Sequence, residues 1–505
     1  MIEKIIGCAL FGLKGEKVDV EVNVSRGAKF LMVGLPDNAV KESHYRIAAA
    51  LKNIGYKIPI KEIIINLAPA DLKKEGSAYD LPIALGILLA SEQIISKELN
   101  KYMIMGELSL DGKIRPIKGV LSMVVKAKEM GLKGVIIPFE NLNEASLVNN
   151  IEIIGSKNIT EIINHFCKDI KISPKIFFFK ENICKINDLD FMDVYGQQLA
   201  KRAIEIAAAG GHNILMIGPP GSGKSMLAQR IPSILPELNE KEILETTMVY
   251  SYLGKFNHKN GLIYHPPFRN PHHTISDVAL VGGGSHPKPG EISLAHNGVL
   301  FLDELPEFKR KVLETLRQPL ENREITISRS MSSVTFPSNI MLVAAMNPSP
   351  DGGYYDLESN KQSFHKVNHY LSKLSQPLLD RIDLQIEVES VEIDCFTNSN
   401  NNNEKSSTIK KRVLSARNIQ HERQGKNNAM LNSKELNLNC TFNKKSLELV
   451  KRANSRQKLS ARSFTRIQKI ARTIADLDGA SSIEFNHVAE ALQYRSLEKM
   501  KAFLS

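Results

Sequence analysis

The sequence predicts an α/β multidomain protein: an N-terminal α+β domain, a phosphate-binding α/β core and a C-terminal helical region. Three observations predict this order. Segments typical of strands alternate with helical ones up to about residue 165. The motif "GPPGSGKS", residues 218–225, follows an apolar strand and opens a helix. From residue 409 onward the pattern is almost wholly helical, and basic.

The length of 505 residues suggests about three domains, at roughly 150 residues each. The stretch "FCKDIKISPKIFFFKENICKIND" lacks a clear period and is typical of a linker. The Asn-rich "TNSNNNNEKSST" is of low complexity and predicts a flexible joint. We therefore expect an N-terminal domain at 1–166, a linker at 167–189, a core at 190–392, a joint at 393–408 and a helical lid at 409–505.

The N-terminal domain is expected to be β-rich. "KVDVEVNVS", "KFLMVGL" and "EIIINLAP" predict strands, and "AVKESHYRIAAALKNIG" predicts a helix that ends at a glycine. The start, "MIEKIIGCALFGLKGEK", carries Glu3 and no small-residue cleavage site, which argues against a signal peptide. We expect it to form the first strand.

The core is expected to contain a parallel sheet. Four short apolar runs, near 213–217, 299–302, 340–345 and 384–388, have the length of buried parallel strands.

Composition excludes several classes of protein. No apolar run approaches the ~18 to 20 residues of a membrane span. The five cysteines show no C-x-x-C spacing, which excludes a disulfide framework and a zinc knuckle and suits a reducing cytoplasm. The formal net charge of +11 favours a polyanionic partner such as nucleic acid. We expect a cytoplasmic protein without a membrane partner.

The motif at 218–225 is a complete phosphate loop. Its glycines let backbone N–H groups turn toward a β-phosphate, and the helix N-terminus adds partial positive charge. Lys224 is expected to reach the β- and γ-phosphates, and the Ser225 hydroxyl to coordinate Mg²⁺. An ordinary glycine-rich turn is the alternative, which the flanking strand and helix disfavour. The candidate binding residues are Gly218, Pro219, Pro220, Gly221, Ser222, Gly223, Lys224 and Ser225.

Two further strand ends carry polar residues that suit hydrolysis. The strand in "GVLFLDE" delivers Asp303 to the Mg²⁺ shell, with Glu304 beside it to polarise the attacking water. Unpaired carboxylates at the end of a buried strand are costly, so an ordinary exposed strand end is the weaker interpretation. The strand in "NIMLVAAMN" ends at Asn347, whose amide suits orienting that water.

An arginine in "QPLLDRIDL" leaves two interpretations open. Arg381 can pair with Asp380 or Asp383 in its own subunit, or it can reach the γ-phosphate of a neighbour.

In their order, these motifs resemble the AAA+ ATPases. The stretch "FRNPHHTISDVALVGGGSHPKPGEISLAHNGVLFLDELPEFKRKVLETLRQPLENREITISR" resembles the magnesium-chelatase ATPase subunit and, more closely, the YifB/ComM group of chelatase-like proteins. The likeness covers essentially the whole chain. It implies ATP and Mg²⁺ as ligands and a ring, a homo-hexamer.

The resemblance also implies roles for particular residues. An insert in the second helix of the core, around Tyr252 to Pro289, and a β-hairpin at 324–336 are expected to face the pore of the ring. Arg381 is implied to act in trans as an arginine finger, and Arg462 in the helical lid to act as a second sensor against the nucleotide. A solvated helix arginine is the alternative for Arg462.

Many relatives carry a cysteine cluster after the sensor Asn, with the look of a small metal site. This chain has Ser349 and Asp351 in that stretch and no cysteine. His365 and His369 are spaced i, i+4, but two histidines without thiolates make a weak zinc site. We expect no metal site there beyond the Mg²⁺ of the nucleotide.

The N-terminal domain resembles the proteolytic domain of the Lon protease, a ribosomal-S5-like fold. Lon uses a Ser–Lys pair, and the matching positions here are Ala78 and Leu121. Ser77 and Lys118 are displaced by one and three places. We therefore expect a domain that is inactive as a protease.

Three functions compete on these grounds. The resemblance implies a DNA motor, a helicase or translocase on single-stranded or branched DNA that drives branch migration in the recombination of incoming strands during natural transformation. The alternative is a chelatase-like ATPase that remodels a protein or a metal–tetrapyrrole partner. A peptidase or peptide-binding module is disfavoured by Ala78 and Leu121.

The N-terminal domain and the charge favour the motor. Residues 444–472 carry ten Lys/Arg and one acid, Glu448, a density that suits phosphate contacts. Solvated lid helices with nucleotide and subunit contacts are the alternative. The candidate DNA contacts are Lys288 and Arg329, although Arg329 could instead pair with a neighbouring acid and hold the ring together.

Overall fold

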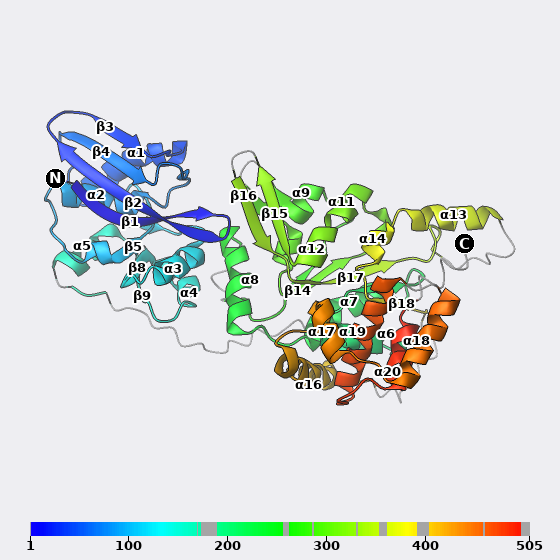
Figure 1. The fold of residues 1–505 in the computed structure, drawn as a ribbon. Coiled ribbons are helices and arrows are strands. Elements are labelled where there is room, and N and C mark those ends of the chain that lie inside the picture. The colour runs from blue at the N-terminus through cyan, green and yellow to red at the C-terminus, as the bar shows by residue number, and fades with distance from the viewer. Residues whose placement is uncertain are drawn as a thin grey trace. The chain divides into compact units, whose positions relative to one another are not determined.

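The computed structural model describes residues 2–168, 170–172, 189–255, 262–284, 287–329, 332–352, 361–390, 403–457 and 460–495. The chain divides into two compact units, residues 1–182 with 243–263, and residues 183–242 with 264–505 (Figure 1). Most of the expected linker and most of the expected Asn-rich joint lie outside the described residues.

The first unit is built on a seven-stranded mixed sheet of order β3-β4-β2-β1-β5-β8-β9. Strand β2 shows why the segment folds this way, because Val18, Val20 and Val22 alternate with polar residues and are fully buried. The start of the chain is a strand, as predicted. The strands are β1 (Ile2–Phe11), β2 (Lys14–Ser25), β3 (Phe30–Val33), β4 (Glu62–Ala68), β5 (Tyr102–Ile104), β8 (Gly134–Pro138) and β9 (Glu152–Ser156).

One helix forms the centre of this unit. Every residue of α2 (Asp80–Ala90) is buried, and its packing against the sheet is so close that a Cβ on Gly86 would lie 2.7 Å from Val22 Cγ2. The remaining elements are α1 (Asn38–Asn53), α3 (Val120–Glu129), α4 (Leu142–Ala145), α5 (Ile159–Cys167) and the ribbon β6 (Glu107–Leu108) with β7 (Ile114–Arg115).

A segment from the expected core packs with the first unit. Helix α8 (Glu240–Tyr252) belongs to it from Ile243 onward. Leu244 and Met248 pack on the cluster that contains the buried residues of α3, and the Gly119 N–H donates to Ser251 O at 3.1 Å. The helix that leads into the expected insert therefore has its apolar contacts on the N-terminal unit.

The second unit contains a five-stranded parallel sheet of order β11-β14-β17-β10-β18. All residues of β10, β14 and β17 are buried, which is why these strands read as unbroken apolar runs in the sequence. The four predicted runs are confirmed to within two residues. The strands are β10 (Ile214–Ile217), β11 (Phe268–Arg269), β14 (Gly298–Leu302), β17 (Ile340–Met346) and β18 (Leu384–Glu387).

Helices and two small hairpins complete the core. The predicted hairpin at 324–336 is present as β15 (Glu324–Arg329) and β16 (Ser332–Pro337). A second, β12 (Gly282–Gly283) with β13 (Lys288–Pro289), lies in the expected insert. The helices are α6 (Gln198–Gly210), α7 (Lys224–Ile234), α9 (Asp277–Val281), α10 (Glu291–Leu294), α11 (Arg310–Thr315), α12 (Arg317–Asn322), α13 (Lys361–Ser372) and α14 (Gln376–Leu379).

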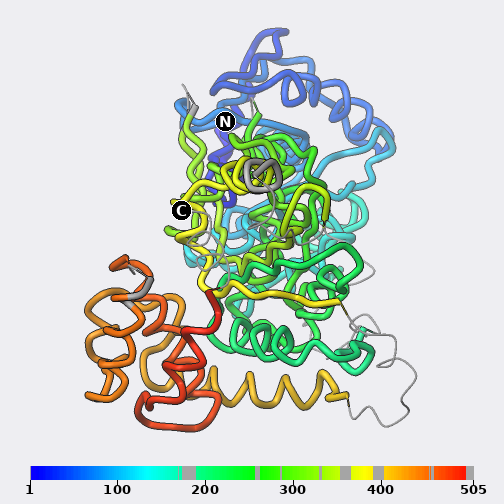
Figure 2. The backbone as a smooth tube through the Cα atoms, turned by 90° about the vertical axis from the view of Figure 1, so that its right-hand side faces the viewer, coloured from blue at the N-terminus to red at the C-terminus, as the bar shows by residue number. Residues whose placement is uncertain are grey.

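The C-terminal region is helical, as predicted. Figure 2 shows its helices, in orange and red, gathered into a bundle at one side of the second unit. Helices α16 and α19 pack against α6. None of the helices in the described ranges is long and apolar enough to cross a membrane. The bundle consists of α16 (Ser406–Gln424), α17 (Ser433–Asn439), α18 (Lys444–Gln457), α19 (Ala461–Leu477) and α20 (Phe485–Gln493).

Candidate active site

The phosphate loop connects the carboxyl end of β10 to α7. Gly218 lies so close to the backbone after β18 that a Cβ would sit 2.2 Å from Val388 O. Its N–H donates to Met346 O at 3.2 Å, which ties the loop to the end of β17. Gly223 has φ +87°, a left-handed conformation that favours glycine. These constraints explain the first and last glycines of the motif, Gly218 and Gly223.

Lys224 curls back over this loop. Its Nζ donates to Gly218 O at 2.7 Å, to Pro219 O at 2.8 Å and to Asn347 Oδ1 at 3.4 Å. Burial lowers the pKa of Lys224, and the charge of Asp303 opposes that shift. The ammonium group of Lys224 therefore lies beside Asn347, as expected for residues that follow the carboxyl ends of neighbouring parallel strands.

The neighbouring hydroxyl and carboxylate also meet. Ser225 Oγ donates to Asp303 Oδ2 at 2.6 Å. Hydroxyl and carboxylate oxygens are ligands that Mg²⁺ accepts. A Cβ added at Gly221 or Gly223 would meet no atom within 4 Å, so there is open space beside the loop. The residues fit a nucleotide with Mg²⁺.

Glu304 lies at the same edge of the sheet. It has φ 51° and begins the short helix η4 (Leu305–Glu307). Its side chain is 56% exposed, and Oε2 lies 3.0 Å from His273 Nδ1. His273 belongs to the segment before α9 and is not among the site residues expected from the sequence. The signal was present, because "NPHHT" lies in the stretch that identified the family.

The two arginines lie at the opposite edge of the sheet. Asn213 immediately precedes β10, and its Nδ2 donates to Arg381 O at 2.8 Å. The Asp383 N–H donates to Asn213 O at 3.0 Å. Because Lys224 follows the carboxyl end of β10, the strand separates it from Arg381 by about 13 Å of rise. The structure does not bring Arg381 to the phosphate loop of its own chain.

The intrachain partner of Arg381 is neither carboxylate considered from the sequence. Its Nη2 donates to the Glu321 carboxylate, on α12. Asp383 pairs instead with His212, at 3.2 Å. Asp380 lies 3.6 Å from Arg466.

Arg462 lies near the same edge. Its side chain is 64% exposed, and Nη1 lies 3.6 Å from Asp380 Oδ2. Asp380 directly precedes Arg381, so the structure groups Arg462 with the amino end of β18 and not with Lys224 of the same chain.

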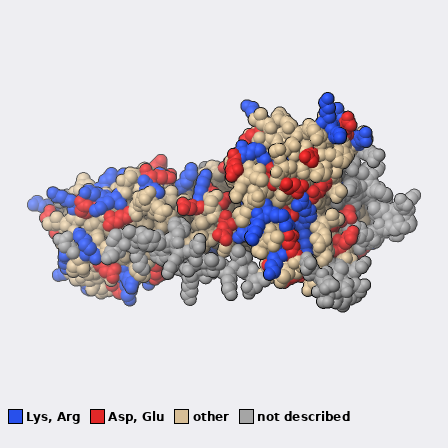
Figure 3. All heavy atoms as spheres, turned by 90° about the horizontal axis from the view of Figure 1, so that it is seen from below, with Lys and Arg blue, Asp and Glu red and all other residues tan. Residues whose placement is uncertain are grey.

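The basic segment 444–472 is only partly available to a ligand. Arg466 and Lys469 donate to backbone carbonyls, and Arg472 pairs with Asp476 at 2.9 Å. Four cations of α18 are exposed: Lys444, Lys445, Lys451 and Arg452. On the face in Figure 3, Lys and Arg side chains are interspersed with Asp and Glu.

The candidate DNA contacts both lie on hairpins. Lys288 is exposed on β13. Arg329 is the last residue of β15 and is opposite Ser332, while its side chain lies outside the described residues.

Two further observations concern positions that the sequence suggested for other chemistry. Ser77 donates its hydroxyl to Glu107, and Leu121 is fully buried in α3. Within the described ranges, no group of three or more His, Cys, Asp or Glu could hold a metal ion, and the side chain of His365 lies outside those ranges.

Three family descriptions match the chain. "Magnesium chelatase, subunit ChlI" matches residues 190–395, "Subunit ChlI of Mg-chelatase" matches 20–141, and "Magnesium chelatase, subunit ChlI C-terminal" matches 403–495.

Curated relatives extend the match to the full length. The chain is 45% identical to the competence protein ComM of Haemophilus influenzae, covering 98% of each chain. It is 42% identical to the uncharacterized protein YifB of Escherichia coli, covering 97% of this chain and 96% of that one. A shorter match, 32% identical over 144 residues, is to Lon protease 2 of Bacillus subtilis and covers 28% of this chain. The chain therefore belongs to the YifB/ComM family of magnesium-chelatase-like AAA+ ATPases.

Proposed function

We propose that this protein is a ring-forming, ATP-hydrolysing DNA motor that acts in the recombination of incoming DNA. One observation carries the proposal: the phosphate loop and the arginines Arg381 and Arg462 lie at opposite edges of one sheet. A site divided in this way becomes complete when the arginine edge of one subunit meets the phosphate loop of the next. A closed hexamer repeats that contact around the ring.

Binding of ATP depends on the loop and on Lys224. The Nζ hydrogen bonds to Gly218 O and Pro219 O hold the ammonium group above the loop, where phosphate oxygens can take their place. Because these oxygens are charged, the new hydrogen bonds are stronger than those to carbonyls.

Ser225 and Asp303 would hold the metal ion. Mg²⁺, when bound, neutralises charge on the phosphate oxygens. Ser225 Oγ and Asp303 Oδ2 already lie 2.6 Å apart and supply one hydroxyl and one carboxylate oxygen.

Glu304 is the proposed general base. Its exposed carboxylate can accept a proton from a water molecule, and His273 at 3.0 Å holds it in orientation. Asn347, which accepts from Lys224 Nζ at 3.4 Å, can orient the same water relative to the γ-phosphate.

Arg381 would complete the neighbouring site as a finger, and Arg462, on the same edge, would reach the same nucleotide. An arginine finger stabilises charge that develops in the transition state and contributes roughly 10³ to 10⁵ in rate. In this proposal the sensor role of Arg462 also acts between subunits.

Three observations support DNA as the partner. A close relative over the full length is named a competence protein. The chain carries a net charge of +11, and the hairpins β12–β13 and β15–β16 bear Lys288 and Arg329. Basic side chains on hairpins that line a pore can contact the phosphate backbone of a central strand without reading its sequence.

A branched-DNA unwinding assay, run beside DNA-stimulated ATPase activity, tests this function. We expect ATP-dependent branch migration that stops in Glu304→Gln. A ring that hydrolyses ATP but binds no DNA even at low salt would exclude the motor and favour a chelatase-like remodeller.

A further inference from the structure

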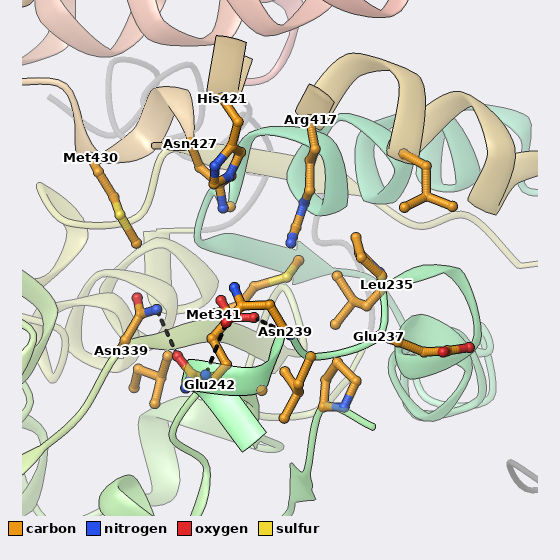
Figure 4. Close-up of a pocket in the computed structure, with 18 of the residues that line it drawn as sticks. Leu235, Glu237, Asn239, Glu242, Asn339, Met341, Arg417, His421, Asn427 and Met430 are labelled. Carbon is orange, nitrogen blue, oxygen red and sulfur yellow. Dashed lines mark hydrogen bonds between the residues drawn. The ribbon is translucent and has the colours of Figure 1, made fainter. Parts of the chain in front are cut away.

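A second cavity lies at the edge of the core sheet opposite the phosphate loop. It has a volume of about 310 Å³, and Gly298 and Ile340, the first residues of β14 and β17, are part of its wall. The loop after α7 forms another side, and α16 with η5 (Asn428–Met430) closes it from the helical bundle (Figure 4). All of these elements belong to the second unit.

Arg417 enters this cavity from α16, as Figure 4 shows. Its Nε and Nη2 donate to Ala208 O at 3.0 and 2.7 Å, which fixes the plane of the guanidinium. Across the described part of the chain, Nη1 has no protein acceptor. One edge of a fixed guanidinium is therefore free to bind a ligand.

A second arginine lines the same cavity. Arg323 directly follows α12 as its C-cap, and its Nη1 donates to Asn339 Oδ1 at 2.8 Å and to Ile340 O at 3.2 Å. Its Nε and Nη2 have no acceptor among the residues that the structure describes.

Neither arginine forms an ion pair with a described carboxylate. Glu242 is the acid whose charge acts on the pKa of Arg417, and its carboxylate accepts the Asn239 N–H at 3.0 Å. Burial lowers the pKa of Arg417 to about 10 and also lowers the pKa of Arg323. Two partly buried cations thus line one cavity and form no ion pair, an arrangement that favours binding of an anion.

The rest of the wall is suited to an organic group. Met341, Met430 and Leu235 supply apolar surface, Asn427 and His421 supply polar atoms, and Glu237 and Glu242 are the two carboxylates in the wall. Ligand pockets range from about 300 to 1,000 Å³, so this cavity takes a compound of mononucleotide size or less.

We propose that this cavity binds a small phosphomonoester, with its phosphate on Arg417 and Arg323 and its organic group against Met341 and Met430. A phosphate monoester carries a charge near −2 at pH 7, which matches two guanidinium groups better than a single carboxylate does. Planar guanidinium groups also bind phosphate oxygens in pairs.

Binding of a phosphomonoester in this cavity would regulate the ATPase. This consequence rests on the proposed function. The cavity wall contains strand ends of the core and residues of α16 in the helical bundle. A ligand that contacts both parts therefore favours one arrangement of the core and the bundle. Arg462 lies on α19 of the same bundle, and a change in the bundle therefore changes the edge that meets a neighbouring subunit.

Titration calorimetry with AMP and with inorganic phosphate tests the site on the full chain. We expect Arg417→Gln to weaken AMP binding at least about tenfold. Leu414→Trp, at a position that is 36% exposed on α16, should block the cavity without removing a charge. Lys411→Ala, an exposed cation on the same helix, is the matched control and should bind AMP as the wild type does.

The phosphate loop is a second place where AMP could bind, so Lys224→Ala is measured in parallel. Binding that persists in Lys224→Ala and is lost in Arg417→Gln and Leu414→Trp supports the cavity. Binding lost only in Lys224→Ala, or retained in both cavity variants, overturns it and leaves the proposed function intact. Succinate binding in place of phosphate would overturn the phosphomonoester assignment.

The regulatory step has its own readout. AMP should change the ATPase rate of the wild type at least twofold and leave the rate of Leu414→Trp unchanged. Equal rates with and without AMP in the wild type would overturn regulation. If the chain hydrolyses no ATP under any condition, the proposed function fails while calorimetry still decides the cavity.

Discussion

Arg381 and Glu321 form an ion pair near the amino ends of the core strands, whereas Lys224 lies beyond the carboxyl end of β10. The pair satisfies only part of the guanidinium, because Arg381 Nε is buried without a hydrogen-bond acceptor in the described structure. A half-satisfied arginine next to an exposed carboxylate can exchange that partner for a phosphate oxygen of a neighbouring subunit. The pair is thus compatible with the proposed role of Arg381 at the site of a neighbouring subunit.

Arg381→Ala should cripple ATP hydrolysis and spare ATP binding. If the finger acts across subunits, kcat falls by roughly 10³ or more. Mixing Arg381→Ala with Lys224→Ala should restore part of the activity, because one variant supplies an intact loop and the other an intact finger. Glu321→Gln is the control, since it frees Arg381 and should keep hydrolysis. No recovery in mixed rings would count against a role in trans.

Glu304→Gln should bind ATP and fail to hydrolyse it. Lys224, Ser225 and Asp303 still hold the nucleotide and metal ion in this variant, and only the base is lost. Lys224→Ala should instead weaken nucleotide binding. Radiolabelled ATP retained on a filter, read beside phosphate release, separates the two. Hydrolysis by Glu304→Gln at the wild-type rate would show that another group activates the water.

His273→Ala should lower kcat by about tenfold and leave KM for ATP unchanged, because His273 acts by holding Glu304. The double variant with Glu304→Gln should be no slower than Glu304→Gln alone, since both changes remove one function. His272→Ala, at the exposed neighbouring histidine, is the matched control. Additive losses in the double variant would assign His273 a separate role.

The arrangement of the candidate nucleotide residues could be predicted because each follows a strand that the sequence itself defines. Asp303 and Asn347 come directly after the apolar runs that became β14 and β17, and Lys224 follows β10 at the end of the phosphate loop. Carboxyl ends of parallel strands meet at one edge, so local patterns were enough to bring these side chains together.

Partners set by tertiary packing could not be predicted in this way. Glu321 lies 60 residues from Arg381 in sequence, and two nearer aspartates were the natural guesses. The packing of α8 with the N-terminal unit also left no local signal. The charge density of 444–472 suggested a ligand surface, yet Arg466 and Arg472 serve the fold.

Stability of the N-terminal unit should depend on pH through Glu144. Burial raises the pKa of Glu144 from 4.5 to about 7, although Ser251 and Asn141 act in the opposite direction. A carboxyl whose folded pKa is raised stabilises the fold fully below pH 4.5. That stability is lost as pH rises toward 7 and stays lost above it.

Glu144→Gln should therefore raise the melting temperature at pH 8 and flatten its dependence between pH 4.5 and 7. The shift corresponds to about 3 kcal/mol at most, at 1.36 kcal/mol per pKa unit. Thermal unfolding of the full chain at a series of pH values measures it, with the exposed Glu140→Gln as control. An unchanged pH dependence in Glu144→Gln would show that this carboxyl does not titrate in the folded protein.

DNA binding should weaken steeply with salt and show little sequence preference, because Lys and Arg contacts to phosphates release counterions. Arg329→Ala and Lys288→Ala should each assemble and hydrolyse ATP, yet lose DNA stimulation and unwinding together. Each lost phosphate contact should reduce the slope of log affinity against log salt by about 1.

A variant on α18 distinguishes the hairpins from the helical bundle. Lys451→Ala removes one exposed cation of the bundle and should leave unwinding unchanged if the hairpins hold the strand. Should Lys451→Ala lower the salt slope while Arg329→Ala and Lys288→Ala keep it, the DNA binds along α18. Arg329 would then serve the contact between subunits, and its alanine variant should dissociate the ring in sedimentation at low protein concentration.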